Sequence, residues 1–131
     1  MKQAAPPQLE QAFSALQQGR VDDAREMFES LISHSPNRAA AWLGLAYSCA
    51  SLGDDAAVAK AVDRALTLEP RDLRALLFKA DWLVRTGASR KSLAYYDQAL
   101  RVASGAPGPL PQDIEQGLKR GDVLLTMNNE P

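Results

Sequence analysis

Three glycines, Gly19, Gly53 and Gly87, are spaced 34 residues apart, and Pro36 and Pro70 share this spacing. Five further columns keep the same phase: Leu9/Leu43/Leu77, Ala12/Ala46/Ala80, Phe28/Val62/Tyr96, Leu31/Ala65/Ala99 and Ile32/Leu66/Leu100. One coincidence of glycines would carry little weight, whereas seven columns in phase indicate an internal repeat. A unit of this length buries its apolar face against the next unit, so we expect a stack of repeats.

The composition favours helices for these repeats. The chain of 131 residues holds 22 alanines and 18 leucines, against eight valines and isoleucines together and three threonines. Alanine and leucine have high helix propensity, whereas β-branched residues suit strands. We therefore expect three helix pairs in one domain, at about 8–18 and 22–34, 38–52 and 55–68, and 72–86 and 89–103.

Signals for helix ends recur in each repeat. The three glycines fall where the first helix of a pair ends, because glycine most easily adopts the left-handed conformation found there. Asp54 and Ser89, and Asp22 or Asp23, then stand near the start of the next helix, where a short oxygen acceptor caps free amides. The two prolines cannot continue a helix and close the first two repeats.

The last part of the chain differs from the repeats. Residues 105–111 are rich in glycine and proline and predict a loop, and a helix is expected from 111 to about 126. Ile114, Leu118 and Leu125 fall on one face of this helix, with Leu124 near its edge. A terminal helix that covers the exposed apolar face of the last repeat is the usual capping device of such stacks. The alternative is a helix that docks onto a partner.

The middle repeat carries the pattern of a known family. It has an aromatic residue, a leucine, a small residue, a glycine and a proline at the expected places: Trp42, Leu45, Ala46, Gly53 and Pro70. This pattern resembles the tetratricopeptide repeat. It departs from the family at Cys49, where tyrosine is usual, and at Val58 and Val62, where alanine and an aromatic residue are usual.

The other two repeats match less completely. The first carries Ala12, Gly19, Ala24, Phe28 and Pro36, and the third carries Leu76, Ala80, Gly87, Tyr96 and Ala99. Gln8, Ser92 and Ser104 depart from the pattern. The resemblance implies an all-α, right-handed α-α superhelix of three helix pairs plus a C-terminal capping helix, in a single domain over 1–131. The repeats would span about 5–38, 39–72 and 73–106.

The residues that catalysis needs are scarce. Zinc and iron sites built on histidine need at least two histidines, and this chain has only His34. His34 stands at the end of a predicted helix, where a protonated imidazole interacts favourably with the helix dipole. Cys49, the only cysteine, is expected to be a buried structural thiol. No phosphate-binding glycine loop or nucleophile elbow is present. We expect no catalytic residues, no metal and no cofactor.

The resemblance also implies a working surface. The first helix of each tetratricopeptide repeat lines the concave face of the superhelix, which here gives a candidate partner-binding groove of Phe13, Gln17, Leu43, Tyr47, Ser51, Arg74, Phe78, Asp81 and Arg85. Aromatic residues beside arginine suit an extended or helical peptide. The alternative is that Phe13 and Tyr47 pack between neighbouring first helices.

Two features narrow the partner. Family members that bind chaperones grip a C-terminal carboxylate with lysine, asparagine and arginine, at positions that are here Leu9, Phe13, Gly44, Arg74 and Phe78. Only Arg74 conforms, so a carboxylate clamp is disfavoured. Residues 69–104 hold seven basic and four acidic residues, which favours an acidic partner or is a solvated helix face.

A narrower resemblance concerns the segments 71–81 and 109–113. They are similar to the N-terminal repeat region of bacterial proteins with an aspartyl/asparaginyl β-hydroxylase domain, which depends on iron and 2-oxoglutarate. This implies an accessory module for substrate positioning or oligomerisation, cut near Pro131 from a longer enzyme. The main prediction is a cytoplasmic scaffold for a protein or peptide, without nucleic acid or membrane, and monomeric or a weak homodimer.

Overall fold

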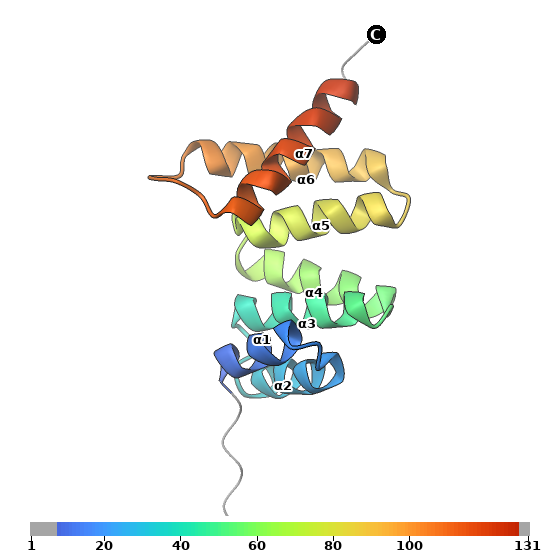
Figure 1. The fold of residues 1–131 in the computed structure, drawn as a ribbon, viewed down its shortest axis with the longest axis vertical. Helices are drawn as coiled ribbons and strands as arrows, with labels where there is room; N and C mark the ends of the chain where they lie inside the picture. Colours follow the sequence, from blue (N-terminus) through green and yellow to red (C-terminus); the bar gives the residue numbers. More distant parts are fainter. Residues whose placement is uncertain (1–7, 129–131) are drawn as a thin grey trace, which may run out of the picture. The chain divides into compact units, whose positions relative to one another are not determined.

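The computed structural model describes residues 8–128, which form seven helices and no strand (Figure 1). The expected start of the first repeat at residue 5 lies outside the described residues, as do 129–131. The helices are α1 (Leu9–Gln17), α2 (Val21–His34), α3 (Ala39–Ser51), α4 (Asp55–Leu68), α5 (Leu73–Arg85), α6 (Ser89–Ser104) and α7 (Gln112–Asn128). The predicted all-α fold of three helix pairs and a terminal helix is confirmed.

The chain divides into two compact units. The N-terminal unit extends to Glu69 and contains α1 to α4, and the C-terminal unit begins at Pro70 and contains α5 to α7. The single domain expected over 1–131 stays a prediction.

The repeated glycines end the first helix of each pair as predicted. Gly19, Gly53 and Gly87 have φ of +81°, +77° and +89°, the left-handed region that disfavours residues with a β-carbon. The amide after the glycine donates back to the helix, for example from Arg20 to the carbonyl of Ala15 at 2.9 Å. This closure satisfies helix-end carbonyls and reverses the chain in a few residues.

The predicted caps are only partly present. The Asp54 carboxylate accepts from the Ala57 amide, as expected, and Asp72 caps α5 in the same way. The caps predicted for α2 and α6 are wrong, because their N-cap residues are Arg20 and Ala88, without a side-chain bond. The residue directly after each glycine takes the N-cap position, so Asp22, Asp23 and Ser89 lie inside their helices, and only Asp54 has a carboxylate at that position.

Within the N-terminal unit, each helix packs against the next, and α1 also lies beside α3. Fully buried Ala12, Ala15 and Ala24 allow close approach of α1 and α2, and Phe28 and Leu31 fill the space beside them. The prediction that small residues recur where helices touch is confirmed, since Ala12, Ala46 and Ala80 are all 0% exposed.

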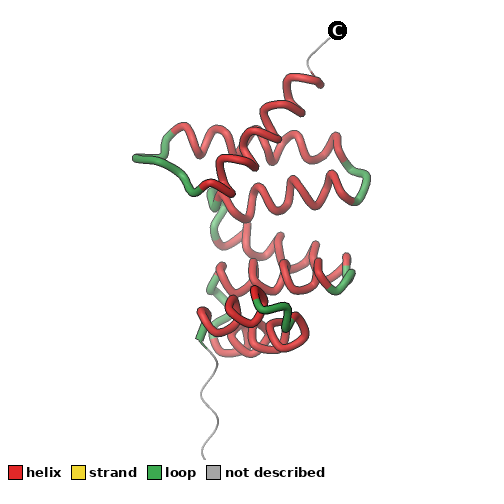
Figure 2. Tube along the Cα trace, viewed as in Figure 1, coloured by secondary structure: helices red, strands yellow, loops and turns green. Residues whose placement is uncertain are grey.

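The C-terminal unit is a helix pair covered by a third helix. A loop follows α6 (Figure 2), and α7 then packs against α6 and α5. Ile114 on α7 is buried, and Leu118, Leu124 and Leu125 are half-buried. The capping role predicted for this helix is therefore present within the C-terminal unit.

Candidate functional site

The candidate groove residues of the N-terminal unit lie on α1 and α3, which are neighbours. Leu43 is buried, Phe13 and Tyr47 are half-buried, and Gln17 and Ser51 are exposed. The Ser51 hydroxyl donates to the Tyr47 carbonyl at 3.2 Å. The exposure of these side chains therefore ranges from a buried leucine to solvent-exposed polar residues.

Phe13 has a packing role within its own repeat. Its ring meets the Phe28 ring edge to face, with centroids 4.9 Å apart and an interplanar angle of 71°. Such aromatic pairs add to the stabilisation that burial gives. This ring contact joins α1 to α2, and the half-buried Phe13 ring keeps some exposed surface.

Gly44 is one of the positions that bind a C-terminal carboxylate in other family members. Here the Phe28 ring packs directly over it. A β-carbon at Gly44 would lie 2.1 Å from Phe28 Cε1, so only glycine fits beneath the ring. This position faces the core of the N-terminal unit and offers no side chain to a ligand. The carboxylate clamp stays disfavoured.

In the C-terminal unit, two candidate groove residues contact the terminal helix. The Arg74 guanidinium bonds the Asp113 carboxylate, and Arg120 Nη2 lies 2.7 Å from Asp81 Oδ2. Asp81 also accepts a hydrogen bond from the buried Tyr96 hydroxyl. Arg74 and Asp81 therefore hold α7 against α5.

These contacts shift two pKa values. Burial, and then the hydrogen bond to Asp81, raise the pKa of Tyr96 well above its usual range. The hydrogen bond from Arg74 lowers the pKa of Asp113. Tyr96 is thus a neutral donor and Asp113 an ionised acceptor at neutral pH.

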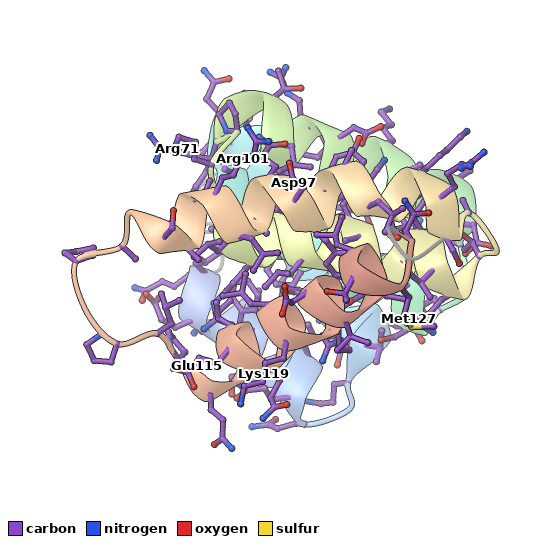
Figure 3. The ribbon with its side chains drawn as sticks, turned by 90° about the horizontal axis from the view of Figure 1, so that it is seen from above. Arg71, Asp97, Arg101, Glu115, Lys119 and Met127 are labelled. Atoms are coloured by element: carbon purple, nitrogen blue, oxygen red, sulfur yellow. The ribbon has the colours of Figure 1, made fainter. Side chains whose placement is uncertain are left out.

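The other groove candidates of this unit are Phe78, which is half-buried, and Arg85, which is exposed. Arg85 lies in the last turn of α5, where a cation favourably meets the helix dipole. The basic character of the third repeat is partly neutralised, since Arg101 Nε lies 2.9 Å from Asp97 Oδ2 on α6 (Figure 3). This pairing favours a solvated helix face for that part of the surface.

Sequence reasoning missed the α7 partners Asp113 and Arg120, and also Lys79. Lys79 is 8% exposed, and its ammonium lies 5.8 Å from the Trp82 ring centroid and 5.6 Å from that of Tyr95. Cation–π contact helps to hold a buried cation. The sequence signal was a lysine 34 residues after Leu45, at a position that is apolar in the middle repeat.

Among residues 8–128, no group of three or more His, Cys, Asp or Glu side chains could hold a metal ion. His34 is exposed, and its Nδ1 lies 2.8 Å from the Ser30 carbonyl oxygen. Cys49 is fully buried, as predicted, and burial raises the pKa of its thiol. None of the described helices is both long and apolar enough to span a membrane.

Residues 9–57 match the family model described as tetratricopeptide repeat. This segment of the chain carries the tetratricopeptide repeat pattern. The matched range covers α1 to α3 and the start of α4. A comparison with curated proteins finds no match.

Solved structures share the fold of this repeat protein. The type III secretion translocator chaperone SycD of Yersinia enterocolitica gives a TM-score of 0.78 at 17% identity, covering 91% of this chain and 79% of SycD. The structure of SycD with a peptide of the translocator YopD gives a TM-score of 0.79 at 17% identity, covering 93% of this chain and 92% of SycD. The structure of PcrH with the chaperone binding region of PopD gives a TM-score of 0.76 at 20% identity, covering 90% of this chain and 85% of PcrH.

SycD has also been solved as an alternative dimer. At these identities the likeness is one of fold. None of the comparisons bears on the narrower resemblance to hydroxylase-domain proteins, which stays a prediction.

Proposed function

We propose that this protein is a non-catalytic scaffold that binds a peptide or a protein segment through the first helices of its repeats. The observation that carries the proposal is the shared fold with SycD, solved with a peptide of YopD, and with PcrH, solved with the chaperone binding region of PopD, both matched over at least nine-tenths of this chain. A rigid helical frame that presents side chains to an extended or helical segment is a recurrent mode of peptide recognition.

The α1–α3 surface is the part of the candidate groove that we assign to the partner. The exposed parts of Phe13 and Tyr47 offer aromatic contact area, and Gln17 and Ser51 supply a polar rim. Aromatic anchors with a polar rim are typical of protein interfaces. Within the C-terminal unit, Arg74 and Asp81 act in this proposal by holding α7 against α5, and Phe78 and Arg85 are candidate partner contacts of that unit by itself.

The test uses two matched substitutions of exposed hydroxyl residues. On α3, the Ser51 hydroxyl donates to the Tyr47 carbonyl, four residues earlier. On α4, the Thr67 hydroxyl donates in the same way to the Asp63 carbonyl, at 2.8 Å. Ser51→Arg places a long cation on the proposed surface, whereas Thr67→Arg places it on a second helix. Both changes lose a similar local hydrogen bond, so their effects on stability should match.

The readout is quantitative mass spectrometry of proteins captured from the native host by each tagged variant. We expect Ser51→Arg to lose the partners of the wild type, and Thr67→Arg to keep them. Capture that is unchanged in Ser51→Arg, or lost equally in both variants, contradicts the proposal. Arg74→Glu is a poor probe of the groove, because it also breaks the bond to Asp113.

A further inference from the structure

A pocket of about 370 Å³ opens in the N-terminal unit between α2, α3 and α4. Its apolar lining consists of Ile32, Trp42, Leu45, Cys49, Ala57 and Ala61. On α3, Leu45 and Cys49 stand two residues after Leu43 and Tyr47, which is about 200° around the helix. The pocket therefore opens on a different side of α3 from the proposed peptide surface.

Small side chains create this space. Cys49 is fully buried and lines the pocket at the position where the repeat pattern usually has tyrosine, and Ala57 and Ala61 are small α4 side chains that also line it. The Trp42 indole nitrogen donates to the Pro36 carbonyl at 2.7 Å, which fixes the orientation of its ring. The pocket is thus preformed, with one immobilised aromatic wall.

The charged residues that line the pocket are Arg25, Glu29 and Lys60. Arg25 is already engaged, because its Nη2 lies 3.2 Å from Asp54 Oδ2 and its Nε lies 3.8 Å from Glu29 Oε1. Lys60 forms no ion pair with any described residue. Its ammonium is therefore the cation that remains for a ligand.

We propose that this pocket binds a small monocarboxylate with an apolar body. The apolar part packs against Ile32, Trp42 and Leu45, and the carboxylate pairs with Lys60 at the rim. Ligand pockets of this size are mostly apolar, with a few polar groups that set orientation. A cation without a partner at the edge of an apolar pocket favours an anion over a neutral molecule. The proposal is independent of the peptide surface on α1 and α3.

The chain holds its own reporters for this site. It has two tryptophans and one cysteine, so Trp82→Phe, in the C-terminal unit, leaves Trp42 as the only indole. Decanoate is the probe, and decan-1-ol is its neutral counterpart. We expect decanoate to change Trp42 fluorescence saturably and to slow alkylation of Cys49.

Two substitutions separate the apolar and charged contributions. Ala57→Leu fills the pocket and should weaken binding of both probes about tenfold or more, because a packed site accommodates extra methyl groups poorly. Ala56→Leu, on the exposed adjacent position, is the matched control and should bind as the wild type does. Lys60→Gln should weaken decanoate about two- to fivefold and leave decan-1-ol unchanged.

Three results would overturn the proposal: no saturable response to decanoate, equal affinities in Ala56→Leu and Ala57→Leu, or decan-1-ol binding as tightly as decanoate. A fourth is loss of the captured protein partner in Ala57→Leu, because the pocket would then hold a partner side chain. Far-UV circular dichroism checks that each variant folds. If Ala57→Leu does not fold, the comparison of Lys60→Gln with the wild type carries the test, since Lys60 is exposed.

Discussion

The close contact between α7 and α6 at Gly121 provides a sharp test of the packing. Gly121 lies within α7 and is buried against Tyr96. A β-carbon there would lie 2.6 Å from Tyr96 Cδ1, 2.8 Å from Cγ and 2.9 Å from Cβ. Because Tyr96 Cβ is bound to the α6 backbone, Gly121→Ala can be accommodated only if the two helices move apart.

The expected magnitude is the difference between two effects. Overpacking a tight contact costs about 1–3 kcal/mol, and this contact belongs to the upper part of that range because the backbone must move. Alanine in place of glycine favours the helix by about 1 kcal/mol. Gly121→Ala should therefore lower the free energy of unfolding by about 1–2 kcal/mol.

Gly117→Ala, one turn earlier on the same helix, is the matched control. The nearest atom to its added β-carbon is Leu77 Cδ1 at 2.9 Å, the end of a flexible side chain that can rotate away. Its cost and its helix gain should nearly cancel, to within about 1 kcal/mol. Urea unfolding followed by circular dichroism measures both variants. A Gly121→Ala variant that is as stable as the wild type, or no less stable than Gly117→Ala, would contradict the close contact between α7 and α6.

Three further predictions concern single residues. Gly53→Ala should lower the free energy of unfolding by about 1 kcal/mol in the same urea assay, because φ at this position is +77°. The added β-carbon would have no heavy atom within 4 Å, so the cost is backbone strain alone. An unchanged unfolding midpoint would rule out this strain. The raised pKa of Tyr96 means that the folded state favours the neutral hydroxyl, so its contribution is complete below pH about 10 and is lost as pH rises through the folded pKa. Wild-type stability should therefore fall more steeply above pH 10 than that of Tyr96→Phe, and parallel pH profiles would refute the assignment. Cys49 is fully buried with a raised thiol pKa, so iodoacetamide should modify it far more slowly in native protein than in urea; equal rates would contradict its burial.

The repeat spacing predicts the helices well because the glycines and prolines that end them act locally. A glycine with positive φ and a nearby proline set the helix ends within a few residues, whatever the rest of the chain does. The caps of α2 and α6 were mispredicted for a related reason. Each helix closure places the residue directly after its glycine at the N-cap, and that residue is Arg20 or Ala88 in these two helices, without a side-chain acceptor.

The site was less predictable because its decisive contacts are distant in the sequence. Arg74 pairs with Asp113, and Asp81 with Arg120, both across 39 residues. The loop before α7 breaks the 34-residue phase, so no column of the repeat points to these pairs. The pocket beside Cys49 had one sequence signal, the cysteine in place of the usual tyrosine, but its lining comes from three helices that the repeat pattern alone does not place around one space.

Site-specific photo-crosslinking tests most directly whether a partner binds the first-helix surface. A benzophenone amino acid replaces Gln17 on α1 or, as control, Thr67 on α4, both of which are exposed. After irradiation with the captured partner, covalent adducts are identified by mass spectrometry. The proposed function predicts an adduct from position 17 and none from position 67. An adduct from position 67 alone, or equal adducts from both, would place the partner elsewhere and contradict it.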